Sequence, residues 1–349
     1  MQHLMGLIYL TYFHPYTINI KIAANSMMTG VLTNSPVSSS HFILYSIFLI
    51  SIVFLLVMSQ TRILIKTRKL LKEKGQALEL IEVQKVELEL RDRNITDSLI
   101  YAQRIQEALL PSESYFRKHF ADSFILFKPK NIVSGDFYWI GEKGEKIFVV
   151  AADCTGHGVP GALMSMIGLK IIEKTINEDN IEIPSKILAV MNRGLEKTFS
   201  REKNIGTIIR DGMDIGLCII DRKRKKVDYA GAFLPLYLIR DGNLIEIIAD
   251  KIIIGMNPGG LPYTDHEIDL LDDDIFYIFS DGYVDQFGGN ENKKFMYRRF
   301  RYLLTTIHHF PVNDQKAILD ENIKTWMGSN EQVDDIMVIG FRPLIGDTK

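Results

Sequence analysis

The hydrophobic positions of this chain follow three successive patterns, and the first is a continuous apolar run. Phe42 to Met58 is apolar apart from one Tyr and two Ser. A helix of these 17 residues would rise about 25 Å at about 1.5 Å per residue. The uncharged residues through Thr61 extend it toward the thickness of a hydrocarbon core, about 30 Å. The run predicts a transmembrane helix over 41–61, with a buried core helix as the alternative.

The second pattern is a long polar segment with regularly spaced apolar residues. From Ile63 to Leu110 the chain is rich in Leu, Glu, Lys, Gln and Arg, with one Gly and no Pro, which predicts a helical linker over 62–110. Ile81, Leu88, Ile95, Ala102 and Leu109 recur every seven residues. They form one seam of a coiled coil. Charged residues occupy the companion seam, so we expect either a homodimer through this linker or a single solvated helix.

The third pattern covers 111–349, where short apolar runs alternate with helix-like segments. The expected strands are Ser123–Phe127, Ile147–Ala152, Ile215–Ile220, Lys226–Ala230, Leu236–Ile239, Leu244–Ala249, Ile275–Phe279 and Ile336–Phe341. The expected helices are Pro160–Asn177, Pro184–Phe199 and Asp314–Met327. Several strands follow one another across turn-forming residues, as in hairpins. Antiparallel strands with helices outside predict an α+β sandwich.

The charge distribution predicts which side of the membrane each flank of the helix faces. Lys21 is the one charged residue through Thr61, whereas the segment from Arg62 to Lys74 carries six Lys and Arg and a single Glu. By the positive-inside rule this flank is cytoplasmic. We therefore expect a single-pass protein of the inner (cytoplasmic) membrane whose catalytic domain faces the cytoplasm. Residues 1–40 are expected to be a short external or interfacial segment, or part of a longer upstream region.

Composition excludes several other classes. The net charge of -2 gives no electrostatic reason to expect a nucleic-acid partner. The two cysteines, Cys154 and Cys218, stand far apart and without a CxxC pattern, which argues against a disulfide framework or a zinc site.

Four aspartates carry the candidate chemistry. Asp136 and Asp153 adjoin apolar runs and glycines, Asp281 follows the run Ile275–Phe279, and Asp334 precedes the run Ile336–Phe341. Carboxylates gathered from strand ends form oxygen-rich sites for hard divalent cations. The arrangement predicts a metal-dependent hydrolase.

The motifs around these aspartates resemble those of a known family. They are Ser134-Gly135-Asp136-Phe137-Tyr138, Asp153-Cys154-Thr155-Gly156-His157-Gly158, Ser280-Asp281-Gly282 and Asp334-Asp335-Ile336. In this order they resemble the PPM-type metal-dependent serine/threonine phosphatases, above all the bacterial branch named after stage II sporulation protein E (SpoIIE/RsbU-like). The resemblance covers about 95–342 and implies a β-sandwich of two antiparallel sheets flanked by helices.

The resemblance also implies a site with two divalent metal ions, Mn2+ or Mg2+. Asp136, Asp153 and Asp281 match ligand aspartates of the family, and Cys154 matches the residue that ligates through its backbone carbonyl. Asp334 matches the last ligand, with Asp335 as the alternative in register.

Three further residues have more than one reading. His157 is a candidate general acid for the leaving oxygen, or a turn histidine bonded to local backbone. Asp211 and Asp214 could hold a third ion or support the ligands from outside, or could simply serve a turn or strand edge.

Together these features predict a membrane-anchored phosphatase, and the resemblance implies that it acts on phosphoserine or phosphothreonine of a regulatory protein, such as an anti-sigma-factor antagonist. A metal-activated water would be the nucleophile. The alternative is a catalytically silent signalling or scaffold module that retains the fold.

Overall fold

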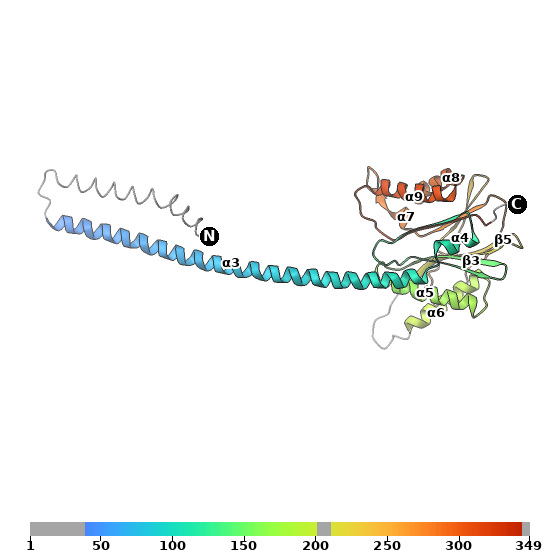
Figure 1. Cartoon of the computed structure of the whole chain (residues 1–349), viewed down its shortest axis with the longest axis horizontal. Helices are drawn as coiled ribbons and strands as arrows, with labels where there is room; N and C mark the ends of the chain where they lie inside the picture. The colour runs from blue at the N-terminus through green and yellow to red at the C-terminus, as the bar shows by residue number, and fades with distance from the viewer. Residues whose placement is uncertain (1–38, 201–210, 344–349) are drawn as a thin grey trace. The chain divides into compact units, whose positions relative to one another are not determined.

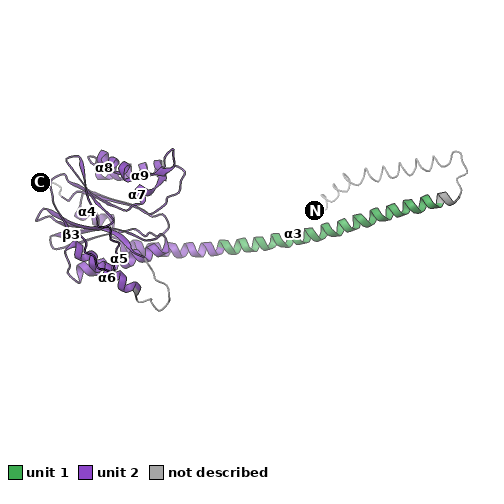
Figure 2. Cartoon of the chain, turned by 180° about the vertical axis from the view of Figure 1, so that it is seen from behind, with its two compact units in different colours: residues 1–89 green, residues 90–349 purple. Residues whose placement is uncertain are grey.

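The computed structural model describes residues 39–200 and 211–343. Most of the expected segment 1–40 lies outside these residues. By its internal contacts the chain divides into two units, residues 1–89 and 90–349, which are coloured separately in Figure 2. The second unit contains all the aspartates singled out above.

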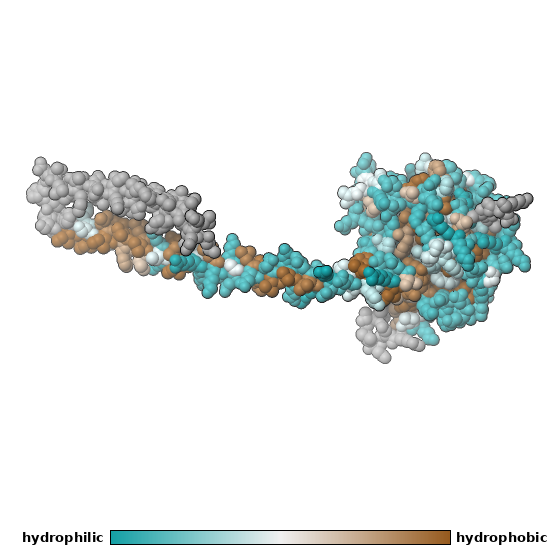
Figure 3. Space-filling view, viewed as in Figure 1, coloured by the Kyte–Doolittle hydropathy of each residue, from teal (hydrophilic) through white to brown (hydrophobic). Residues whose placement is uncertain are grey.

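A single helix, α3 (Ser39–Leu109), covers both the apolar run and the linker. Its apolar side chains are largely exposed in the isolated chain, for example Phe54 at 63% and Leu55 at 67%. Figure 3 shows these residues as a hydrophobic band along the helix. The helix is long and apolar enough to cross a membrane.

The second unit is built on two antiparallel sheets of five strands each. The first, in spatial order, contains β1 (Ser123–Lys128), β12 (Ile336–Phe341), β9 (Ile275–Phe279), β6 (Leu236–Arg240) and β7 (Asn243–Ile247). The second contains β2 (Phe137–Lys143), β3 (Lys146–Cys154), β4 (Met213–Asp221), β5 (Lys226–Ala232) and β8 (His266–Asp269).

Helices cover the outer faces of both sheets (Figure 1). The second sheet carries α5 (Val159–Asn177) and α6 (Pro184–Ser200), and the first carries α8 (Tyr297–Ile307) and α9 (Val312–Met327). Shorter elements are α4 (Glu113–His119), α7 (Gly282–Asp285) and the small hairpin of β10 (Phe287–Gly288) and β11 (Lys293–Lys294). The expected β-sandwich flanked by helices is therefore confirmed.

The alternation of side chains along the strands explains the layers. In β3, Val149 and Ala151 belong to the core between the sheets, while Phe148 and Val150 pack against α5 and α6. Successive side chains of a strand point to opposite faces, so a strand covered on both sides must be apolar at nearly every position. This burial on both sides explains why the strands appear in the sequence as continuous apolar runs rather than as alternating apolar and polar residues.

Strand direction brings the ends of four strands to one edge of the sandwich. In the second sheet Phe137 opposes Ala152, so the start of β2 lies beside the end of β3. In the first sheet Val338 opposes Phe279, so the start of β12 lies beside the end of β9. The loops that carry the predicted site residues leave from these ends.

Candidate active site

Five aspartates come from the strand ends of both sheets. Asp136 directly precedes β2, and Asp153, the penultimate residue of β3, stands opposite Asp214 of β4. From the other sheet, Asp281 follows β9 and Asp334 precedes β12. The structure thus brings together four predicted ligands and one residue for which several roles were open.

These carboxylates raise one another's pKa. Burial, and then the charge of Asp153, raise the pKa of Asp136 well above its usual range. Burial, followed by the charges of Asp281 and Asp334, has the same effect on the pKa of Asp153. Like charges in a partly desolvated site disfavour one another's ionisation. The fold therefore concentrates negative charge here, and Lys294 offsets it only in part at Asp281.

Two members of the cluster keep more contact with solvent. Desolvation, and then Asp281, raise the pKa of Asp214 to about 7. Desolvation, and then Asp285 and Asp334, raise the pKa of Asp281 to about 6. Strong perturbation of several acids in one place is typical of functional sites.

Asp334 and Asp335 are adjacent but lie in different surroundings. Asp335 is 2% exposed, and its Oδ1 and Oδ2 accept hydrogen bonds from the backbone amides of Lys130 at 2.6 Å and Gly135 at 2.7 Å. Asp334 is half-buried, accepts the backbone amide of Asp335 at 2.9 Å, and contributes to the raised pKa values of Asp153 and Asp281. The geometry favours Asp334 as the ligand candidate, and gives Asp335 the task of holding the loop of Gly135.

Two glycines allow the loops to approach this closely. A Cβ at Gly135 would lie 2.7 Å from the carbonyl oxygen of Gly156, and a Cβ at Gly282 would lie 1.9 Å from the carbonyl oxygen of Asp335. Real side chains do not tolerate such contacts with backbone, so only glycine fits.

The remaining predicted residues occupy varied positions. The thiol of Cys154 is buried, and burial raises its pKa well above the usual range, which leaves it inert as a nucleophile. His157 is exposed, and its Nδ1 lies 3.0 Å from Oδ1 of Asn131. Asp211 is half-buried in the loop before β4, whereas Asp214 belongs to the cluster.

Sequence reasoning missed two residues near the cluster. Ser280 is fully buried, accepts the amide of Met337 at 3.0 Å, and lowers the pKa of Asp136 as a hydrogen-bond partner. Tyr297 opens α8, and burial followed by the charge of Asp281 raises its pKa to about 12. Ser280 belongs to the motif Ser280-Asp281-Gly282. Helix α8 was not among the expected helices, so no sequence pattern pointed to Tyr297.

The cluster fits a hard divalent cation. Oδ2 of Asp136 is buried and has no hydrogen-bond partner among the described residues, and the surrounding donors are carboxylate oxygens. Within residues 39–200 and 211–343, no three His, Cys, Asp or Glu side chains are arranged so that they could hold a metal ion as they stand. A cation would compensate the mutual repulsion and satisfy the unpaired oxygen, as oxygen ligands do for Mg2+ and Mn2+.

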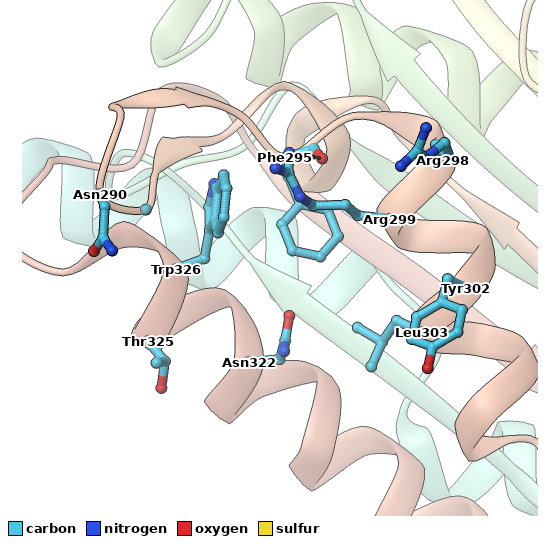
Figure 4. A pocket seen from close by; sticks show the side chains of 10 residues that line it. Asn290, Phe295, Arg298, Arg299, Tyr302, Leu303, Asn322, Thr325 and Trp326 are labelled. Atoms are coloured by element: carbon cyan, nitrogen blue, oxygen red, sulfur yellow. Dashed lines mark hydrogen bonds between the residues drawn. The ribbon is translucent and has the colours of Figure 1, made fainter.

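A cavity of about 700 Å³ lies elsewhere, between α8, α9 and the β10–β11 turn (Figure 4). Its walls include Phe295, Leu303 and Trp326, with the Arg299 guanidinium 4.7 Å from the Trp326 ring centre. None of its lining residues is an acid, a histidine or a cysteine. It therefore lacks the side chains that acid–base or metal-assisted hydrolysis would use.

Known proteins share this architecture. The PP2C domain of SiaA from Pseudomonas aeruginosa is 32% identical with a TM-score of 0.66, over 72% of this chain and 98% of that domain. Phosphoserine phosphatase RsbU of Bacillus subtilis (strain 168) is 26% identical over 195 residues, which are 54% of each protein. The chain thus matches about half the length of that curated relative.

A family model provides the assignment. The model of stage II sporulation protein E (SpoIIE) matches residues 143–343, which is more than half of the chain and includes Asp153, Asp214, Asp281 and Asp334. Asp136 lies just before the matched residues, but the fold places it beside Asp153. The chain belongs to the stage II sporulation protein E family.

Proposed function

We propose that this protein is a metal-dependent protein serine/threonine phosphatase, a phosphoric monoester hydrolase. The observation that carries the proposal is the buried carboxylate of Asp136, whose Oδ2 lacks a partner among the described residues while its pKa is raised by burial and by Asp153. A buried, unpaired acid among other acids costs stability. A bound cation would offset that cost, because it would satisfy the unpaired oxygen and reduce the repulsion between the acids. Membership of the family supports the same chemistry.

Two divalent ions, Mn2+ or Mg2+, would be held by Asp136, Asp153, Asp281, Asp334 and the backbone carbonyl of Cys154. Asp214, with Asp211, would hold a third ion or support the ligands from outside. When bound, such ions supply an activated water and positive charge for the phosphoryl oxygens. Because the cluster itself is anionic, an uncompensated site would repel a phosphate ester.

Two side chains of the protein would orient the Asp136 loop and protonate the leaving oxygen. Asp335 fixes the loop that carries Asp136 through its bond to the amide of Gly135. His157 would donate a proton to the leaving serine or threonine oxygen. If Nδ1 of His157 donates to Asn131 at 3.0 Å, Nε2 is the nitrogen left to exchange that proton.

The name of one relative supports a phosphoserine substrate. RsbU is called a phosphoserine phosphatase, so we place phosphoserine or phosphothreonine of a regulatory protein, such as an anti-sigma-factor antagonist, as the substrate here. A folded or peptide substrate can reach the site because Asp281 and His157 are exposed.

The apolar part of α3 would anchor the enzyme in the inner membrane in a single pass, with the phosphatase domain in the cytoplasm. The linker part of α3 would form a homodimer. Ile81, Leu88 and Ile95 are 58%, 60% and 59% exposed in the single chain, so a second copy would cover otherwise solvated apolar surface.

A silent signalling or scaffold module is the competing function. Hydrolysis of p-nitrophenyl phosphate by the purified full chain, with Mn2+ and with chelator, separates the two. The enzyme requires turnover that depends on Mn2+ and is lost in Asp153→Asn and Asp281→Asn. If the folded, Mn2+-loaded protein shows no turnover, the scaffold module is the function that remains.

A further inference from the structure

Two exposed apolar residues, Phe233 and Met296, have a backbone conformation that side chains rarely adopt. Among the described residues, seven that are not glycine have a positive φ angle. Four of them are Asn or Asp, which tolerate this conformation, and Lys225 belongs to the tight turn between β4 and β5. Phe233 and Met296, with φ of 61° and 73°, are the two that remain. For a bulky residue such an angle is a strained exception that the surrounding structure must enforce.

Phe233 is the middle residue of a three-residue turn between β5 and β6. The amide of Leu234 donates to the carbonyl oxygen of Ala232 at 2.8 Å, and with a positive φ between them this is the rare, strained form of the γ-turn. The amide of Phe233 donates to the carbonyl oxygen of Asp250 at 2.8 Å. The buried hydroxyl of Tyr229 donates to the carbonyl oxygen of Leu234. These bonds hold the turn, yet the Phe233 side chain stays 42% exposed, so burial of the ring does not offset the strain.

Met296 occupies the N-cap position of α8. Its side chain offers no strong acceptor to the helix, whereas Ser, Thr, Asp and Asn are preferred there. Its φ of 73° and ψ of 145° lie close to a region that is almost reserved for glycine. The amide of Met296 fixes this conformation by donating to the carbonyl oxygen of Val284 at 2.8 Å. Met296 is 53% exposed, so here too burial does not offset the strain.

Both residues lie on the edge of the sandwich that carries the aspartates. Phe233 joins the end of β5 to the start of β6. The end of β5 lies beside the start of β4, which carries Asp214, and the start of β6 lies beside the end of β9, which leads to Asp281. Met296 is bonded to Val284 of α7, the helix that starts directly after Asp281. The two exposed apolar residues therefore border the part of the cluster formed by Asp214 and Asp281.

We propose that Phe233 and Met296 are specificity-determining residues that contact an apolar side chain next to the phosphoserine of the protein substrate. A phosphate held at the aspartates places the residues on either side of the phosphoserine against this edge. A bound substrate would cover the apolar surface, which gives a reason for strain that persists at a functional site without burial in the free protein. The inference rests on the proposed phosphatase function and adds the chemistry by which the substrate segment is selected.

The test uses two phosphoserine peptides that differ only in the residues flanking the phosphoserine, Leu in one and Asn in the other. Their hydrolysis by the full chain in detergent, at saturating Mn2+, is compared between the wild type and two double variants. Phe233→Gly with Met296→Gly removes both side chains and fits the positive φ angles. Phe233→Leu with Met296→Leu keeps apolar side chains. Phe310→Gly is the matched control, since Phe310 is 39% exposed and lies beyond the opposite end of α8.

We expect the wild type to favour the Leu peptide through a lower KM. The Gly pair should raise the KM of the Leu peptide about tenfold and that of the Asn peptide far less, with kcat unchanged, because the contact is the same in the ground state and the transition state. The Leu pair should keep most of the preference, and Phe310→Gly all of it. The Gly pair should melt no lower than the wild type, because it relieves the strain at both turns. If it does not fold, Phe233→Asn, which tolerates the same φ, decides the question by the same comparison.

Equal KM values for the two peptides in the wild type, or an equal rise for both in the Gly pair, would overturn the inference while leaving the phosphatase intact. A Gly pair that melts well below the wild type and loses kcat would also overturn it, because both residues would then serve the fold. A folded, Mn2+-loaded wild type that hydrolyses neither the peptides nor p-nitrophenyl phosphate would overturn the proposed function itself, and the inference with it.

Discussion

Gly135 donates its backbone amide to Oδ2 of Asp335 at 2.7 Å, across 200 positions of the chain. The other oxygen of Asp335 accepts the amide of Lys130 at 2.6 Å. Both oxygens are therefore committed to the backbone. Asp334, one residue earlier, remains to face Asp153 and Asp281. Two adjacent acids thus have separable tasks, which substitutions can distinguish.

Asp335→Asn should destabilise the domain. The amide group can replace only one of the two acceptors and sets an N–H against the other donor, so a buried amide of Lys130 or Gly135 loses its partner. We expect a loss of about 1–3 kcal/mol in the free energy of unfolding, measured by urea denaturation of the metal-free protein. Asp334→Asn is the matched control, with unfolding free energy unchanged or higher and Mn2+-dependent turnover lost. The reverse pattern would exchange the two roles.

The metal-free domain should lose stability as pH rises. For Asp214 the unfolded value lies near 3.8 and the folded pKa at about 7, so between them the folded form binds more protons than the unfolded form. The contribution of Asp214 to the stability of the domain is therefore fully present below pH 3.8 and is lost as pH rises toward 7. The raised pKa values of Asp136 and Asp153 act in the same direction.

Melting temperatures from pH 5 to 8, with chelator and with Mn2+, measure this effect. We expect Asp153→Asn to melt above the wild type at pH 8 in chelator, because it removes one repelling charge, and to gain less from Mn2+. A chelated wild type that becomes more stable as pH rises through this window would show that the carboxylates do not repel one another.

His157→Asn should separate two kinds of substrate. A serine leaving group needs a proton, whereas p-nitrophenolate leaves without one. We expect turnover of a phosphoserine peptide to fall about 100-fold, with hydrolysis of p-nitrophenyl phosphate nearly unchanged. Equal effects on both substrates would assign His157 to the turn rather than to proton transfer. Asn131→Ala, which removes the partner of Nδ1, should give a smaller loss of the same kind.

Most strands could be predicted because each sheet is buried on both of its faces. The expected bounds of Ile275–Phe279 and Ile336–Phe341 coincide with β9 and β12, whose residues are buried throughout. Helix α8 was not predicted, because it exposes Tyr297, Tyr302 and several arginines, and its buried residues Phe300, Leu304 and Ile307 form a narrow stripe.

The gathering of the aspartates could be predicted from the sequence, whereas their hydrogen bonds could not. Asp136, Asp153, Asp281 and Asp334 stand at the ends of apolar runs, and the fold brings these strand ends to one edge. The division of tasks between Asp334 and Asp335 depends on which backbone amides come within reach, and those amides belong to loops about 200 positions away.

The proposed linker dimer can be tested on the seam of α3. Leu88→Glu together with Ile95→Glu places charge on a surface that a second copy would cover. We expect the full chain in detergent to change from dimer to monomer in light scattering after correction for bound detergent. Glu89→Gln with Arg93→Gln, which are exposed on the same helix away from the seam, should leave the dimer intact. A wild type that is monomeric under these conditions would remove the dimer from the account.

The central claim is that these carboxylates bind divalent ions to hydrolyse phosphoserine or phosphothreonine. The most direct measurement is phosphate release from a phosphoserine peptide by the full chain, titrated with Mn2+, beside Asp153→Asn and Asp281→Asn. The account predicts turnover that is absent in chelator, saturates with Mn2+, and is lost in both variants although they remain folded. Turnover that persists in chelator or in both variants would contradict it, as would a folded, Mn2+-saturated wild type that releases no phosphate.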